Sequence, residues 1–294
     1  MAHVTVIIPA YNPGIYLKST LESVIAQTFA DWNVIVVDDG SKEDLSYAAD
    51  MDHRIRVVRQ KNGGVSVARN MGMRETSSEL VAFLDADDIW LPTKLEAQVA
   101  IMDADTDIGL CHTHFHVVDE KLHKISDGYG HNITNYRELL KGCGIFASSV
   151  MVRRSSALKV GLSDPFLTFS QDYDLWLKIA CFYKIARVPT VEALYRRHSN
   201  NRSHNYGVTH GISVDILQKH IRHARLRGDM DSVRAAQFGI RSITHTYGCK
   251  AFDQARQAMQ KGGTDFAPHL WWAARRSPHF VLRSLLSYAK EQMR

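Results

Sequence analysis

The sequence predicts an α/β protein with a mostly parallel sheet flanked by helices, followed by a helical C-terminal extension. Over the first 90 residues, short apolar runs alternate with stretches in which apolar residues recur at helical spacing. This alternation is typical of parallel strands joined by crossover helices. From about residue 210 onward, the apolar residues keep helical spacing and form no convincing strand pattern. This second observation predicts the extension.

Four apolar runs predict the parallel strands, and each leads into polar residues. The strands are expected over Val4–Ile8, Val34–Val37, Ile55–Val58 and Leu80–Leu84, with helices over Gly14–Thr28 and Gly64–Thr76. Runs of this kind are typical of strands that are buried on both faces. Ser41 is expected to cap a helix after the second strand, with Asp44 completing a weak capping box.

The elements after Pro92 follow a looser pattern. A helix, a strand, a loop, a strand and an amphipathic helix are expected over Lys94–Met102, Ile108–Val118, Glu120–Ile133, Ser148–Val152 and Gln171–Phe182. In the extension, helices are expected over Val214–Leu226, Val233–Thr246, Ala251–Gln260 and Phe280–Met293. We therefore expect two domains, with the sheet in residues 1–204 and a basic, mainly helical region in residues 205–294.

Composition and charge narrow the class of protein. Of the 294 residues, 45% are hydrophobic and 23% are charged, as in ordinary soluble globular proteins. No apolar run approaches the roughly 18 residues of a membrane-spanning helix. Because the four cysteines form no CxxC pair and no basic leader precedes the first strand, we expect a reduced, cytoplasmic protein. Residues 205–294 contain 14 Lys or Arg and 6 Asp or Glu, a net charge of +8 in a chain of net charge +5.

Polar clusters after the four strands are expected to surround one crevice. They are Tyr11–Asn12, Asp38–Ser41, Asn62–Gly64 and Asp85–Asp88. The carboxyl ends of parallel strands lie at the same edge of a sheet, and open α/β sheets bind ligands there. The sequence therefore predicts a ligand site at this edge.

The fourth cluster carries three carboxylates in the segment Leu84-Asp85-Ala86-Asp87-Asp88. Neighbouring carboxylates repel each other unless a cation or water neutralises them. Mg²⁺ is typically held by one or two carboxylates together with substrate phosphates. We interpret the segment as an Mg²⁺ or Mn²⁺ site that serves a nucleotide diphosphate; a solvated acidic turn is the alternative.

Three other segments allow both a functional and a structural interpretation. Asp38–Ser41 could bind a ribose or a base, or form an ordinary turn. Asn62–Gly64 could bring backbone N–H groups to an anion with Arg69 beside them, or serve as a common glycine turn. Asp172 or Asp174 could be a general base, or could simply favour a helix N-terminus.

Three histidines, His112, His114 and His116, alternate along a predicted strand and therefore share one face. They could form a metal site. A half-exposed strand face is the favoured interpretation, because no carboxylate or cysteine accompanies them at ligand spacing.

Taken together, these motifs resemble glycosyltransferase family 2, the inverting nucleotide-sugar transferases with the GT-A (Rossmann-like) fold. The resemblance covers about residues 3–204. It rests on Val6–Asn12, Val36–Ser41, Asn62–Gly72, Phe83–Trp90 with Pro92, Lys94 and Leu95, Gln171–Leu177, and Tyr195–His198. Each motif is modest alone, whereas the ordered set at family-like spacing is specific.

The resemblance implies a role for each matching residue. Asp172 would be the catalytic base, and Asp87 would bind the metal ion with Asp85 and His198 as further ligands. The nucleotide-sugar, by default a UDP-sugar, would contact Pro9, Ala10, Tyr11, Asn12, Asp39, Asn62, Gly64, Arg69, Asp85 and Ala86. The family usually has Glu before its base where this chain has Gln171, which lowers the like-charge repulsion on Asp172.

The resemblance also implies an acceptor, a glycan or lipid-linked saccharide used in bacterial surface polysaccharide biosynthesis on the inner face of the plasma membrane. The basic, aromatic segment from Trp271 to Leu286 would either contact that membrane peripherally, or pack on the sheet domain or on another subunit of a homo-oligomer. No recognised nucleic-acid module accompanies the charge, so we expect no nucleic-acid partner.

Other functions are less consistent with the motifs. A sugar nucleotidyltransferase would have a glycine-rich loop that contains Arg and Lys after the first strand. This chain has Pro9–Gly14 at that position, which argues against the class. A dinucleotide-dependent oxidoreductase would have GxGxxG after a strand. A catalytically weak nucleotide-sugar-binding subunit or scaffold of a polysaccharide assembly complex is the remaining alternative. It is disfavoured because Asp39, Asp85, Asp87 and Asp172 are all present.

Overall fold

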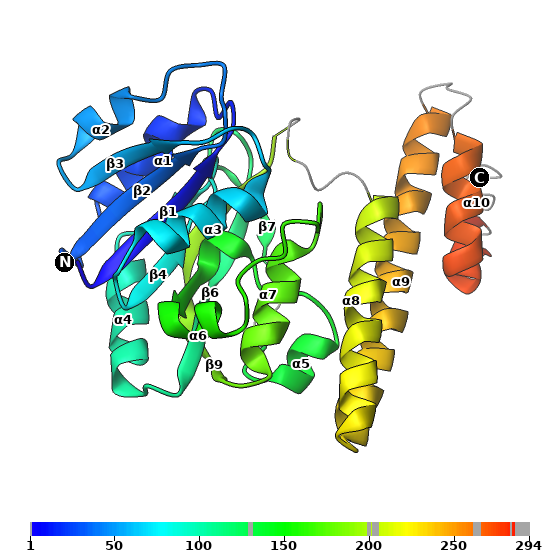
Figure 1. The fold of residues 1–294 in the computed structure, drawn as a ribbon. Helices are drawn as coiled ribbons and strands as arrows, with labels where there is room; N and C mark the ends of the chain where they lie inside the picture. Colours follow the sequence, from blue (N-terminus) through cyan, green and yellow to red (C-terminus); the bar gives the residue numbers. More distant parts are fainter. Residues whose placement is uncertain are drawn as a thin grey trace. The chain divides into compact units, whose positions relative to one another are not determined.

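The computed structural model describes residues 2–128, 132–198, 201, 206–260, 266–282 and 284–285. The chain divides into two compact units (Figure 1). The sheet unit comprises residues 1–139 and 143–201, and the helical unit comprises residues 140–142 and 202–294.

In the described part of the chain, nine strands form one sheet (Figure 1). The strands are β1 Val4–Ala10, β2 Trp32–Asp38, β3 Ile55–Arg59, β4 Leu80–Phe83, β5 Ile89–Trp90, β6 Ile108–Val118, β7 Lys124–Asp127, β8 Val150–Arg153 and β9 Lys184–Arg196. Their order is β3-β2-β1-β4-β8-β6-β9-β5, with β7 paired to β6.

The sheet has two halves of different construction. Strands β1 to β4, the parallel half, pair with one another in parallel. Strands β5 to β9, the mixed half, contain the parallel pair β6–β9 together with the antiparallel pairs β6–β8, β6–β7 and β5–β9. The halves join at the antiparallel pair β4–β8. The predicted fold class is therefore confirmed, with parallel pairing concentrated where the apolar runs predicted it.

Helices accompany both faces of the parallel half. They are α1 Tyr16–Ile25, α2 Tyr47–Met51 and α3 Val65–Glu75, and the later helices up to residue 201 are α4 Lys94–Ala104, α5 Tyr136–Leu140, α6 Arg154–Lys159 and α7 Gln171–Ala180. Val6 and Ile8 of β1 share a core cluster with Leu17 and Leu21 of α1. A Cβ added at Gly72 of α3 would lie 2.6 Å from the Ile7 side chain, so Gly72 lets α3 pack closely on β1.

Two local predictions in the sheet unit are wrong and one strand was not predicted, each for a physical reason. Ser41 caps no helix, because its hydroxyl accepts the Asn12 N–H, and α2 begins only at Tyr47. The loop predicted over 120–133 contains β7, whose Asp127 pairs with His116 of β6; residues 129–131 lie outside the described part. Strand β9 escaped prediction because it contains Pro189, beside which its pairing with β6 shifts register.

The helical unit contains α8 Tyr206–Leu226, α9 Met230–Gln260 and α10 Phe266–Arg276. Two separate helices were predicted where α9 runs unbroken through Gly248. A Cβ at Gly248 would lie 2.4 Å from the Ser277 hydroxyl, so the glycine that interrupts the sequence pattern allows close packing here. Most of the helix predicted over Phe280–Met293 lies outside the described residues. Within the described part, no helix is long and apolar enough to cross a membrane.

Candidate active site

The loops after β1 and β2 are fastened to each other. The Asn12 backbone N–H donates to the Ser41 hydroxyl at 3.0 Å, and the Lys42 N–H donates back to Asn12 Oδ1 at 2.8 Å. Ala10 is buried at the end of β1, and its carbonyl accepts the Asp39 N–H at 2.8 Å. Tyr11 follows with 54% of its surface exposed. The predicted meeting of these two polar clusters is therefore present in the structure.

Asp39 holds the glycine turn that precedes α3. Its Oδ1 accepts the Gly63 N–H at 2.8 Å and the Gln60 side-chain amide at 2.7 Å, while its Oδ2 accepts the Gly64 N–H at 2.8 Å. Asn62 adds a side-chain bond to the Asp39 carbonyl. Gly64 has a φ of +88°, a conformation that favours glycine. The structure thus shows that this carboxylate, which was predicted to contact a base or ribose, fixes the neighbouring turn through both of its oxygens.

Arg69 of α3 neutralises the first carboxylate of the acidic loop, residues Asp85–Asp88. Its Nη2 lies 2.6 Å from Asp85 Oδ1. The Arg69 side chain is nearly fully buried, whereas Asp85 is about one-third exposed. The buried Nε of Arg69 has no hydrogen-bond partner in the described part of the chain. Arg69 therefore keeps one buried donor that no described protein group uses.

Asp87 of the acidic loop contacts His198, which lies 111 positions later in the sequence. The two side chains meet at 2.9 Å between Oδ2 and Nε2, and the Tyr16 ring stacks on the imidazole at 4.7 Å between centroids. The Asn201 amide lies within 3.4 Å of both partners. Burial, together with the charge of Asp85, raises the pKa of Asp87, and His198 opposes that shift.

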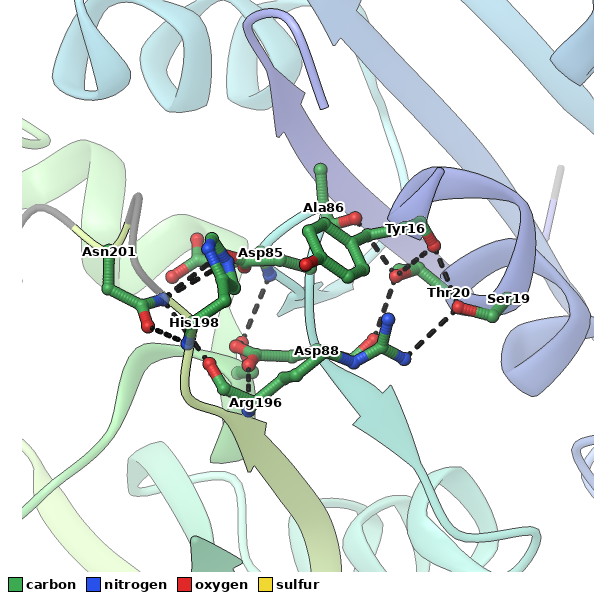
Figure 2. Close-up of polar contacts among 11 residues, drawn as sticks. Tyr16, Ser19, Thr20, Asp85, Ala86, Asp88, Arg196, His198 and Asn201 are labelled. Carbon is green, nitrogen blue, oxygen red and sulfur yellow. Dashed lines mark hydrogen bonds and ion pairs between the residues drawn. The ribbon is translucent and has the colours of Figure 1, made fainter. Parts of the chain in front are cut away.

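Asp88 has a different role from the other two acids. It is fully buried, with Oδ1 accepting the Arg196 N–H at 3.0 Å and Oδ2 accepting the Ser148 hydroxyl at 2.6 Å (Figure 2). Burial raises its pKa well above the usual range. Both of its oxygens are engaged by the protein, so only Asp85 and Asp87 of the three carboxylates are left to face a ligand.

Asp85 and Asp87 could hold a divalent cation that takes its remaining ligands from a substrate. Asp87 and His198 offer one oxygen and one nitrogen 2.9 Å apart, with Asp85 acting electrostatically on Asp87. Among the residues that the structure describes, no three His, Cys, Asp or Glu side chains form a closed metal site. Mg²⁺ and Mn²⁺ suit such an open set, because they take further oxygens from phosphates and water.

Asp172 lies near the first turn of α7, within the field of the same charges. Its Oδ1 accepts the Tyr173 N–H at 2.8 Å. Burial raises the pKa of Asp172, the positive charge of Arg69 lowers it, and the charge of Asp85 raises it further. The preceding residue, Gln171, has a buried Oε1 without a hydrogen-bond partner in the described part of the chain. The predicted base thus belongs to the same electrostatic group as Arg69 and Asp85.

The histidines that were predicted to share one strand face have different surroundings in the structure. His112 is buried, its Nε2 lies 2.7 Å from the Ile133 carbonyl, and burial lowers its pKa. His116 pairs with Asp127 at 3.1 Å, a carboxylate that local spacing does not bring beside it. The β7 strand supplies that partner.

Sequence reasoning missed several residues that shape the site. The Thr20 hydroxyl of α1 has a single proton, which is shared between the carbonyls of Ala86 at 3.0 Å and Asp88 at 2.8 Å (Figure 2). The Tyr16 ring lies under the guanidinium of Arg196, a residue of the predicted Tyr195–His198 motif, at 4.8 Å, and Arg196 also donates to Ser19. No local signal marks Thr20 or Tyr16, because their contacts join α1 to segments more than 60 positions away.

A model of one protein family matches much of the sheet unit. The family is described as glycosyl transferase family 2, and the match covers residues 5–161, a little over half of the chain. The matched range contains the acidic loop and Arg69 but ends before Asp172 and His198.

Two sequence relatives carry glycosyltransferase names. An uncharacterised glycosyltransferase of Rickettsia prowazekii, RP339, is 28% identical over 63% of this chain and 60% of its own length. E. coli WfaP, named UDP-Glc:alpha-D-GlcNAc-diphosphoundecaprenol beta-1,3-glucosyltransferase, is 30% identical over 70% of this chain and 81% of its own length. The chain spans between 42% and 60% of the length of four rickettsial relatives.

A solved structure shares the fold across nearly the whole chain. It is S. aureus TarS 1–349 in complex with UDP-GlcNAc, which covers 98% of this chain and 87% of its own with a TM-score of 0.65. The two sequences are 17% identical, so this likeness concerns the fold.

Proposed function

The chain belongs to glycosyl transferase family 2, and from this premise we propose that it transfers a sugar from a nucleotide-diphosphate sugar to an acceptor hydroxyl with inversion at the anomeric carbon. One observation carries the proposal: Asp172, Arg69 and Asp85 interact electrostatically beside an acidic loop in which only two of three carboxylates face outward. This group combines a base with a site for a diphosphate leaving group.

The donor is a UDP-sugar in this proposal. Its base and ribose lie against Pro9, Ala10, Tyr11 and Asn12, near the turn that Asp39, Asn62 and Gly64 hold in place. The diphosphate lies between Arg69 and the segment from Asp85 through Ala86 to Asp87. The unpartnered Nε of Arg69 supports this placement, because an oxyanion is the partner that a buried guanidinium accepts most readily. The UDP-GlcNAc complex of the structurally similar TarS supports the choice of nucleotide.

Asp172 is the proposed general base. As the acceptor oxygen attacks the anomeric carbon, the Asp172 carboxylate takes the hydroxyl proton, which contributes about 10²–10⁴-fold to such reactions. The bond from the anomeric carbon to the diphosphate breaks in the same displacement, so an α-linked donor gives a β-linked product. The raised pKa of Asp172, which results from burial, makes it a stronger base than an exposed aspartate.

A divalent cation, Mn²⁺ or Mg²⁺, completes the proposed site. Asp87, Asp85 and His198 are the residues that would hold it. When bound, such an ion neutralises charge on the departing diphosphate. Two other side chains act in the same site. Arg69 pairs with the phosphates, and Tyr16 orients the His198 ring by stacking.

The proposed acceptor is a glycan or lipid-linked saccharide in bacterial surface polysaccharide biosynthesis. The name of the E. coli relative, which specifies a GlcNAc-diphosphoundecaprenol acceptor, supports this choice. The test is release of nucleoside diphosphate from a panel of nucleotide sugars, with Mn²⁺ or EDTA, in the presence of GlcNAc-diphospholipid. Metal-dependent release from one donor is expected. Tight binding of UDP without release from any donor would favour a binding subunit or scaffold, and absence of binding would contradict both.

We further propose that the helical unit contacts the cytoplasmic face of the plasma membrane through α10. The Arg275 guanidinium lies over the Trp271 ring at 4.7 Å, and that of Arg276 lies over the Trp272 ring at 3.8 Å. These four side chains line a hollow of about 440 Å³, and Trp271 is 60% exposed. Amphipathic helices with Arg and Trp on one face bind anionic lipid surfaces.

Vesicle sedimentation tests this contact. The double substitution Arg275→Ala/Arg276→Ala is expected to weaken binding to phosphatidylglycerol vesicles at least fivefold, since each charge near such a surface contributes about 1 kcal/mol. The control is Arg222→Ala/Arg225→Ala on α8, which removes the same charge from other exposed positions. Equal losses in both variants, or binding of neither wild type nor control, would contradict a contact through α10.

A further inference from the structure

One buried hydroxyl ties together the two ends of the acidic loop. Ser148 Oγ accepts the Asp85 backbone N–H at 3.0 Å and donates to Asp88 Oδ2 at 2.6 Å (Figure 2). Ser148 is fully buried and lies 60 positions beyond Asp88 in the sequence. The hydroxyl uses its only proton and one acceptor position in these bonds. It thereby links the first and last residues of the acidic loop on the side away from the ligand-facing carboxylates.

The short 3₁₀ turn that carries this hydroxyl, Ala147–Ser149, is itself fixed. The Trp90 indole N–H donates to the Ser148 carbonyl at 2.6 Å, and the Gln98 amide donates to the Ser149 carbonyl at 3.0 Å. The Ser149 hydroxyl bonds back to the Phe146 carbonyl at 2.6 Å. Because the hydrogen bonds from Trp90 and Gln98 are buried, the turn resists following the acidic loop if that loop moves. The Ser148 hydroxyl is therefore a fixed reference point for the loop.

The other oxygen of Asp88 extends the same arrangement to the second wall of the site. Asp88 Oδ1 accepts the Arg196 N–H at 3.0 Å, and His198 follows two residues later with its Nε2 on Asp87. Without the Ser148 donor, Asp88 would keep a buried carboxylate oxygen with no partner, a costly condition that movement of the acidic loop relieves. That movement would alter the spacing of Asp85, Asp87 and His198.

We infer that Ser148 is a positioning residue for the donor site: its hydroxyl sets the distance between the carboxylates of Asp85 and Asp87 and, through Asp88, the place of the His198 segment. The inference rests on the proposed function, in which the donor diphosphate binds at these carboxylates. Ser148 itself does not contact the donor. Its effect is to hold the ligand-facing groups in the binding arrangement before the ligand arrives.

The matched pair Ser148→Ala and Ser149→Ala tests this inference. Both serines are fully buried in the same turn, and both substitutions remove one hydroxyl, but only Ser148 contacts the acidic loop. Ser148→Ala is expected to raise the calorimetric Kd for UDP in Mn²⁺ at least tenfold, whereas Ser149→Ala changes it less than threefold. Thermal unfolding of both variants measures the shared structural cost. Ser148→Cys, which keeps a weaker donor, replaces the alanine variant if that protein fails to fold.

Amide hydrogen exchange gives a second readout that needs no ligand. Loss of the Ser148 hydroxyl is expected to accelerate exchange at the Asp85 amide at least tenfold, while the Leu84 amide, which bonds to the Ile7 carbonyl, stays protected. Equal exchange at Asp85 in the two alanine variants would overturn the inference, as would equal Kd values. A wild type that binds no UDP would contradict the proposed function, and the exchange comparison would still decide whether Ser148 holds the loop.

Discussion

The two halves of the sheet bury different chemistry. In the parallel half, the interior strand positions are mainly aliphatic, as in Val34, Val36, Ile7 and Ile8. The mixed half, the segments next to it and the helix α4 bury charged and polar side chains that hydrogen-bond to one another or to the backbone; these include Asp88, Lys94, Gln98, Ser148, Glu192 and Arg196. The strands of the first half therefore supply the frame of the site, and polar groups from both halves hold its carboxylates: Ser148 and Arg196 contact Asp88, and Arg69 of α3 contacts Asp85.

This difference teaches where function can be lost without loss of the fold. Volume-conserving exchanges within aliphatic packing are tolerated, whereas a buried polar group that loses its partner is costly. Substitutions among the polar contacts should therefore alter binding or pH dependence.

The largest effect is expected for the proposed base. Asp172→Asn should lower turnover at least a hundredfold while UDP binding stays within about threefold of wild type, because the amide cannot accept the acceptor proton. Turnover measured by UDP release and binding measured by calorimetry separate the two effects. Near-normal turnover would show that Asp172 is not the base and that catalysis does not depend on the start of α7.

The next effect concerns Lys94, a buried lysine of α4. Lys94 is fully buried, its Nζ lies 3.9 Å from the Trp90 ring centroid and donates to Gln98, and burial lowers its pKa to about 7. Above pH 7 the unfolded chain binds more protons at this lysine than the folded chain does. The free energy of unfolding should therefore rise with pH, by about 2 kcal/mol between pH 7 and 8.5 from this group alone.

Urea unfolding of wild type, Lys94→Met and Lys61→Met at the two pH values measures this term. Lys61 is exposed in the loop before α3, so its removal should leave the pH dependence unchanged. Lys94→Met should flatten it. Identical pH dependence in all three proteins would show that the mixed half does not hold its lysine at an unusual pKa.

A smaller, tenfold effect is expected at the outward-facing carboxylate. Asp87→Ala should weaken UDP binding about tenfold in Mn²⁺ and little in EDTA, because only the metal-dependent part of binding uses this oxygen. Calorimetry under both conditions gives the comparison. An unchanged response to Mn²⁺ would move the proposed metal site away from the acidic loop.

The smallest effect compares two His–Asp pairs of similar geometry. His198 meets Asp87 at 2.9 Å in the site, and His116 meets Asp127 at 3.1 Å at the β6–β7 pair. His198→Ala should raise the donor KM about fivefold, whereas His116→Ala should leave it within twofold. If the two variants behave alike, the segment after β9 does not contribute to donor binding.

The parallel half could be predicted closely from the sequence because each of its strands is an apolar run that ends in polar residues. β1, β2, β3 and β4 each lie within two residues of the predicted bounds at either end. The meeting of Asn12, Ser41, Asp39 and Gly64 followed from parallel pairing alone.

The mixed half was less accessible to sequence reasoning, for reasons that its contacts make plain. Ser148 was expected only as a strand residue, since nothing near it in the sequence shows that its hydroxyl reaches Asp88. Asp88 itself looks the same as Asp85 and Asp87 until its burial is known. Motif resemblance singled out Arg196 and His198, yet the stacking of Tyr16 on His198 depends on α1 lying beside the end of β9.

The hydrogen bond between Asp88 and Arg196 also has a consequence for synthesis. The two residues are 108 positions apart, so at about 5–20 residues per second the ribosome makes Arg196 roughly 5–20 s after Asp88. During that interval the nascent chain carries its carboxylates without Arg196 and His198. The parallel half can begin to fold in this time, whereas the donor site can close only after β9 has been translated. A chain that ends before β9 would therefore retain residues 5–161, which match the family model, and would lack the assembled site.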